Sequence, residues 1–123
     1  MSIAKAREDI ADALRTVEGL GVETELGATL YPPACGFGPA RFTWALSSSE
    51  PTDATLVIGL VVSDNRGPRV YDDMIEWLPR VAAAIEDNCP DAVIRRANPG
   101  TWPSGGADLP AYLFEVEVAL PWR

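Results

Sequence analysis

The sequence predicts one α+β domain over residues 1–123, with a mixed or antiparallel sheet of about four to five strands and two helices packed on one face. Three observations support this. The chain has 123 residues, of which 47% are apolar, and that suits a single core. Two segments, 3–17 and 71–87, place apolar residues at helical spacing, and residues 112–118 alternate apolar and acidic side chains as a half-buried strand does. The expected order of elements is α-β-β-β-α-β-β.

The first helix is expected to begin after Ser2, which suits an N-cap, and to end near residues 17–18, ahead of Gly19 and Gly21. The apolar stripe of this helix is predicted to consist of Ile3, Ala6, Ile10, Ala13, Leu14 and Val17. A short strand is expected at 22–26.

Residues 31–39 contain three prolines and two glycines, and this composition predicts a loop. A strand is expected at 41–46, with Phe42 and Trp44 on one face. The most apolar strand is expected at 55–62, buried on both faces at the centre of the sheet.

The second helix is expected at 71–87, with a kink beside Leu78 because Pro79 lies inside it. Strands are expected at 92–97 and 111–120, separated by a Pro/Gly-rich loop at 98–110. The crossover from the central strand through this helix is long enough to join parallel strands. The buried stripe of the helix is predicted to be Tyr71, Ile75, Leu78, Ala82 and Ile85.

The net charge of −8 argues against nucleic-acid binding through a basic face, because phosphate contacts need clustered Lys and Arg. Cys35 and Cys89 form no disulfide framework and are expected to be free thiols in a reducing compartment. The N-terminus has no apolar signal-peptide core, and no segment approaches the roughly 20 apolar residues of a membrane span. We therefore expect a soluble chain with no membrane partner.

Residue chemistry offers little support for catalysis. The chain has no histidine, which removes the commonest general base and most zinc sites. Asp72, Asp73 and Glu76 could hold a divalent metal, but acidic residues at a helix start are common because they oppose the helix dipole. Glu115 and Glu117 share one strand face, where they are expected to meet solvent or Arg95 on a neighbouring strand. We expect no catalytic residue, no metal site and no cofactor.

The aromatic residues indicate contact surfaces. Trp102 lies in the 98–110 loop, where it could be an interface anchor or a lid folded over the sheet, and the sequence leaves both interpretations open. Arg95 and Arg96 are expected on opposite faces of their strand. The predicted interface residues are Tyr31, Phe37, Arg95 and Trp102.

The order of these segments resembles the tail terminator, or tail-completion, proteins of long-tailed bacteriophages, particularly those of actinobacterial hosts. The resemblance covers a short first helix, a Pro-rich loop before two strands and the apolar strand at 55–63. It continues through the helix that begins Tyr71-Asp72-Asp73-Met74, the loop Gly100-Thr101-Trp102-Pro103-Ser104-Gly105-Gly106 and the alternating strand at 112–120. Pro79 departs from the uninterrupted helix of that pattern.

The resemblance implies a homo-oligomeric ring, commonly of six subunits, that caps the tail tube and stops its polymerisation. Its implied partners are further copies of itself, the tail-tube protein and the head-completion or connector protein, and DNA passes through the ring without specific binding. It also implies a location in the virion neck, after assembly in the host cytoplasm.

Other functions remain open at this point. Another head–tail connector or a minor tail protein would present the same features. A small ligand-binding or regulatory α+β module could dimerise through its sheet edges. The third alternative is an enzyme that uses a metal held by Asp72, Asp73 and Glu76.

Overall fold

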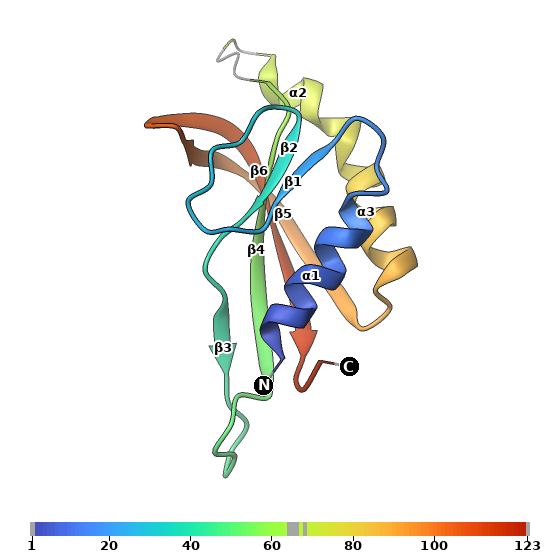
Figure 1. Cartoon of the computed structure of the whole chain (residues 1–123), viewed down its shortest axis with the longest axis vertical. Helices are drawn as coiled ribbons and strands as arrows, with labels where there is room; N and C mark the ends of the chain where they lie inside the picture. The colour runs from blue at the N-terminus through green and yellow to red at the C-terminus, as the bar shows by residue number, and fades with distance from the viewer. Residues whose placement is uncertain (1, 64–66, 68, 123) are drawn as a thin grey trace.

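The computed structural model describes residues 2–63, 67 and 69–122, and its helices and mostly antiparallel sheet confirm the α+β fold class (Figure 1). The sheet has six strands, and four of them precede the second helical region, one more than expected. In chain order the elements are α1 (Ile3–Leu14), β1 (Gly21–Glu23), β2 (Ala34–Phe37), β3 (Arg41–Thr43), β4 (Asp53–Val61), α2 (Val70–Ile75), α3 (Trp77–Asn88), β5 (Ala92–Ser104) and β6 (Ala107–Ala119).

The sheet order is β1-β2-β4-β6-β5, and β3 also pairs with β4. Of the strand pairs in the described residues, β1–β2 is parallel and the others are antiparallel. Since β4 and β5 both run antiparallel to β6, they run in the same direction with β6 between them. The crossover through α2 and α3 therefore joins parallel strands, as its length predicts, and β4 lies in the interior of the sheet.

One face of the sheet is covered by α1 and α3, which lie side by side on it (Figure 1). The main core lies between these helices and the sheet. The largest fully buried side chains of this core include Ile10 and Leu14 of α1, Val81 and Ile85 of α3, and Phe37, Leu56, Ile58, Phe114 and Val116 of the sheet.

Among the described residues, no helix has both the length and the apolar character needed to cross a bilayer.

The predicted second helix is two helices, which meet at Glu76. Pro79 is the third residue of α3, where a missing N–H breaks no intrahelical hydrogen bond. The chain therefore restarts its helix upstream of the proline, and the kink expected beside Leu78 is wrong in position. The buried stripe also differs, since Ile75 is half-exposed and Met74 is buried.

Two segments predicted as loops contain strands. β2 lies between Pro33 and Pro39, and all four of its residues are buried. Residues 98–110 belong to a long β5–β6 hairpin whose turn is Gly105–Gly106, both with positive φ, as a two-residue hairpin turn requires. Two of the prolines in that segment lie on β5, an edge strand, where a missing N–H does not interrupt the sheet.

The ends of some elements differ from the prediction. α1 stops at Leu14, β1 covers 21–23, and β3 covers only Arg41–Thr43. Ser2 holds the N-cap position but makes no side-chain cap, and its hydroxyl donates a 2.6 Å hydrogen bond to the carbonyl of Trp122. This bond ties together the two ends of the chain, which lie near one another in Figure 1.

Candidate functional site

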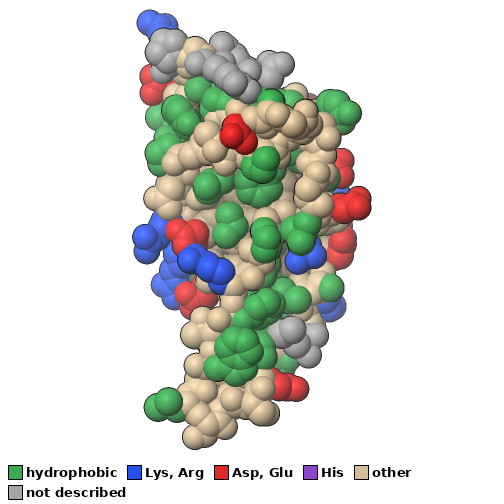
Figure 2. Space-filling view, turned by 90° about the vertical axis from the view of Figure 1, so that its left-hand side faces the viewer, with side chains coloured by type: hydrophobic (Ala, Val, Ile, Leu, Met, Phe, Trp, Pro, Cys, Tyr) green, Lys and Arg blue, Asp and Glu red, His purple; other side chains and the backbone are tan. Residues whose placement is uncertain are grey.

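The face of the sheet opposite α1 and α3 presents the most distinctive surface of the molecule, and we call it the helix-free face. Figure 2 shows charged side chains along both margins of this face and apolar side chains spread over its middle. The period of two along β4, β5 and β6 contributes to both groups, because it sends alternate residues away from the main core.

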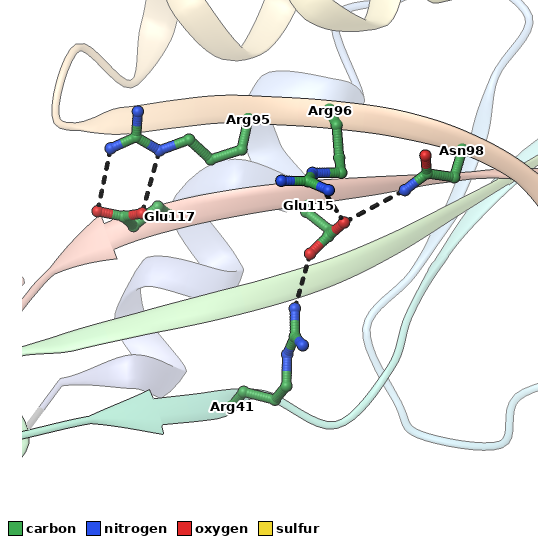
Figure 3. A network of polar contacts seen from close by, with 6 residues as sticks. All are labelled: Arg41, Arg95, Arg96, Asn98, Glu115 and Glu117. Atoms are coloured by element: carbon green, nitrogen blue, oxygen red, sulfur yellow. Dashed lines mark hydrogen bonds and ion pairs between the residues drawn. The ribbon is translucent and has the colours of Figure 1, made fainter.

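One network of charged and polar side chains on this face consists of Arg41, Arg95, Arg96, Asn98, Glu115 and Glu117, and we call it the charged strip (Figure 3). Glu115 is its centre. Its carboxylate accepts from Arg41 at 2.7 Å and from Asn98 at 3.2 Å, and it lies 3.4 Å from Nε of Arg96. Three donors from β3 and β5 therefore converge on one carboxylate of β6.

A β-bulge brings Arg95 and Arg96 to the same face. The register between β5 and β6 shifts between Ile94 and Arg96, so one extra residue fits into β5. Arg95 then makes two contacts with Glu117, at 3.0 and 3.3 Å, and their hydrogen bond lowers the pKa of Glu117 and raises the pKa of Arg95. The predicted Arg95–Glu117 meeting is confirmed, and the prediction of opposite faces is wrong.

Trp102 lies flat over a row of glycines in neighbouring strands. A Cβ added at Gly59 would lie 2.6 Å from Cδ2 of the Trp102 ring, and one added at Gly36 would lie 3.2 Å from Cζ2. The far ends of β5 and β6 curve away from the helices and so carry this ring over β4 and β2 (Figure 1). Of the two interpretations of Trp102, the packing supports the lid.

A second, smaller core forms beneath this lid. Its buried members are Leu30, Ala34, Val61, Leu109 and Ala111, with Trp102 and Leu113 packed against them. Ser104 closes it, since its Oγ accepts a 2.7 Å hydrogen bond from the backbone N–H of Leu30 and lies 3.3 Å from the carbonyl of the same residue. The β1–β2 loop and the β5–β6 hairpin are therefore joined on the helix-free face.

An apolar groove of about 350 Å³ lies beside the lid. It meets the charged strip at Val57, which is directly opposite Glu115 in the β4–β6 register. The groove is lined by Leu26, Phe37, Pro39, Val57, Trp102 and Pro103, together with two glycines, and none of these residues is charged.

The hairpin between β3 and β4 extends beyond the rest of the sheet, at the lower end of the molecule in Figure 1. We call residues 44–52 the hairpin tip. Trp44 is 54% exposed and Leu46 is 99% exposed, although both are large apolar side chains. Solvation of two such residues on one projecting turn has no benefit for folding, so the hairpin tip is a candidate contact surface.

The four predicted interface residues do not form one cluster. Tyr31 is 80% exposed in the β1–β2 loop, Arg95 lies in the charged strip, and Trp102 is partly buried as the lid. Phe37 is 1% exposed and belongs to the main core, so its predicted place in an open loop is wrong. β2 turns this side chain inward, and the sequence reasoning missed it because the flanking prolines hid the strand.

Trp44, Leu46 and Leu26 were not predicted as interface residues. Trp44 and Leu46 stand two residues apart just before a serine-rich turn, and that spacing was the available signal.

The cysteine thiols and the acidic residues of α2 were the other candidates for reactive groups. Burial raises the pKa of the Cys35 thiol to about 12, and burial together with the nearby Asp9 raises that of Cys89. Asp72 and Asp73 are exposed in the first turn of α2. Within the described part of the chain, no group of three or more His, Cys, Asp or Glu residues could hold a metal ion.

Asp9 is the centre of a polar hollow of about 340 Å³ where α1 approaches the chain end. Its carboxylate accepts hydrogen bonds of 2.7 Å from Lys5 and from the indole N–H of Trp122, and these bonds lower its pKa. The hollow thus holds a paired, stabilised carboxylate.

In comparisons with known proteins, no family model matches this chain and no curated protein matches it significantly.

Proposed function

We propose that this chain is a structural virion protein that acts as a tail terminator. In this role it forms a ring on the end of a phage tail tube, stops tube polymerisation and joins the tail to the head-completion proteins. The proposal starts from the resemblance in element order along most of the chain. It also assigns the protein to the neck of the virion, with DNA passing through the ring.

One observation carries the proposal: large apolar side chains are exposed on a projecting hairpin, while the same chain bears an open apolar groove on another surface. Surfaces of this kind suit contacts between proteins. The described carboxylates of the charged strip are both held by arginines, which suits a structural role better than proton transfer.

The charge of the chain is compatible with a DNA channel. With a net charge of −8, a ring of several copies carries a large negative charge. A negative wall repels the phosphate backbone, so DNA can pass without being held.

The test uses the purified chain and the tail-tube protein from the same genome. Light scattering after size-exclusion chromatography should give a mass several times 13.2 kDa, and electron microscopy should show annular particles. Added to polymerising tubes, the chain should cap their ends and shorten them, in proportion to its concentration. Tubes of unchanged length, with no density of the added chain at their ends, would contradict the proposal.

The same assay separates the proposal from its closest alternative. Another head–tail connector or a minor tail protein would bind the virion without limiting the length of free tubes. The apolar groove also favours a ligand-binding module as a second candidate, because pockets of roughly 300–1,000 Å³ with apolar walls accept small molecules. A monomer or dimer that binds a small apolar molecule tightly and ignores tail tubes would support that candidate.

A further inference from the structure

The two large apolar side chains of the hairpin tip are mostly exposed to solvent. Leu46 is almost completely solvated, and Trp44 is more than half solvated. The groove is an open apolar feature on the helix-free face. A cavity of roughly 150 Å³ can hold a benzene molecule, so a groove of about 350 Å³ has room for a leucine and part of an indole.

The tip of one chain cannot fill its own groove. Val57, which lines the groove, lies four residues beyond Asp53 along β4, and this distance is about 13 Å at 3.3 Å per residue. The hairpin tip extends from Asp53 in the opposite direction (Figure 1). A hairpin tip that occupies this groove must therefore belong to another copy of the chain.

Charge favours a second copy of this chain as the occupant of the groove. The hairpin tip contains Glu50 and no basic residue, so its net charge is −1, and Asp53 follows it at the start of β4. The charged strip, which borders the groove, contains three of the ten basic residues with two glutamates, a net charge of +1. On a chain whose net charge is −8, this strip is a place where an acidic tip is attracted instead of repelled.

The sheet edges make the alternative of strand addition less suitable. β1 and β3 have three residues each. The long edge strand β5 carries a bulge at Arg95 and two prolines, Pro99 and Pro103, all of which hinder pairing with another strand. Contacts through side chains on the hairpin tip and the groove avoid these obstacles.

We propose that Trp44 and Leu46 at the hairpin tip of one copy occupy the apolar groove of a second copy. Because the tip and the groove are different surfaces, each copy can give one contact and receive another, as a ring requires. The inference specifies the subunit contact of the ring proposed above, and it rests on that proposal only for closure of the ring.

The first experiment compares Leu46→Asp with Ile75→Asp in the full chain. Ile75 is a half-exposed apolar residue on α2, outside both the tip and the groove, so it receives the same chemical change as a control. We expect Leu46→Asp to weaken self-association at least about 30-fold, measured by light scattering across a dilution series, since a buried leucine is lost. Ile75→Asp should assemble as the natural chain does, and both variants should keep its thermal midpoint.

The second experiment traps the contact with Cys residues introduced by Leu26→Cys and Leu46→Cys in one chain. Leu26 lines the groove, and the natural cysteines are buried, so mild oxidation should join separate copies into a ladder of disulfide-linked species. The control pair, Ile75→Cys with Leu46→Cys, should give no ladder. Absence of the ladder in the test pair, or a Leu46→Asp variant that assembles normally, would overturn the inference.

These outcomes are distinct from failure of the proposed function. If rings form and cap tubes but Leu46→Asp leaves them intact, the tail-terminator proposal stands and this contact is wrong. If the Cys pair links copies into open filaments or dimers that do not cap tubes, the contact stands and the tail-terminator proposal fails. If the groove binds a small apolar molecule while the chain remains monomeric without a ladder, the contact is wrong.

Discussion

Replacement of Gly59 by alanine should displace the Trp102 ring that covers the second core. A Cβ at this position would lie 2.6 and 2.7 Å from two atoms of the Trp102 ring, whereas carbon atoms in contact are separated by about 3.5–4.0 Å. The indole must therefore move by roughly 1 Å or more. The indole is also closely packed near Gly36, since a Cβ added there would lie 3.2 Å from Cζ2 of the ring.

The expected loss of stability follows from two limits. Overpacking of a well-packed site costs about 1–3 kcal/mol, and complete loss of a buried tryptophan costs about 3–5 kcal/mol. Because Trp102 is only partly buried, we expect about 2 kcal/mol for Gly59→Ala. With an unfolding entropy of about 2.1 cal/mol/K per residue, this lowers the thermal midpoint of the 123-residue chain by about 8 °C.

Thermal unfolding followed by circular dichroism, with urea unfolding as a second measure, tests this estimate. Gly38→Ala is the matched control, because its Cβ would lie 3.5 Å from the same ring, an ordinary contact, and its stability should change by less than about 0.5 kcal/mol. In a Trp102→Ala background the cost of Gly59→Ala should nearly vanish. A Gly59→Ala chain as stable as the Gly38→Ala control would refute the packing of Trp102 described above.

Three further predictions concern the core, the loss of stability at low pH and the reactivity of the thiols. Phe37→Ala should lower the free energy of unfolding by about 3–5 kcal/mol because it empties a core site, and a loss below about 1 kcal/mol in urea would place Phe37 outside the core. The bonds from Lys5 and an indole N–H lower the folded-state pKa of Asp9, so they stabilise the fold above the ordinary carboxyl range and lose that effect as pH falls toward the lowered pKa. Asp9→Asn should thus be less stable than the natural chain at neutral pH and equal to it in strong acid, and a constant difference in urea midpoints would contradict this. Burial of Cys35 and Cys89 should leave no fast-reacting thiol in the native chain, whereas both should react with Ellman's reagent after denaturation, and a rapid native reaction would show an open thiol.

The parts of the fold that were predicted well depend on local periodicity. The helical spacing in residues 3–14 and the alternation in residues 112–118 each report which side of one element is buried. The polar pairing of Arg95 with Glu117 was also predictable, because opposite charges on adjacent strands tend to meet. None of these inferences required knowledge of a distant segment beyond the neighbouring strand.

The errors arose where distant segments override local signals. Prolines and glycines at 31–39 and 98–110 predict loops, yet β2 pairs with β4, and Pro99 and Pro103 are tolerated because β5 is an edge strand. A one-residue bulge reversed the predicted face of one arginine, and no local pattern marks its position. The candidate contact surface was missed for the same reason, since exposure of Leu46 depends on how far its hairpin projects.

Composition and the spacing of apolar residues therefore specify an acidic α+β domain with an apolar interior sheet strand and two helical regions, because each pattern reflects the surroundings of a single element. Packing between remote segments selects the rest: Trp102 over Gly59, Phe37 in the core, and the arginines around Glu115. These contacts join strands that are adjacent in space and separated in the chain, so their energies depend on neighbours that no local pattern encodes.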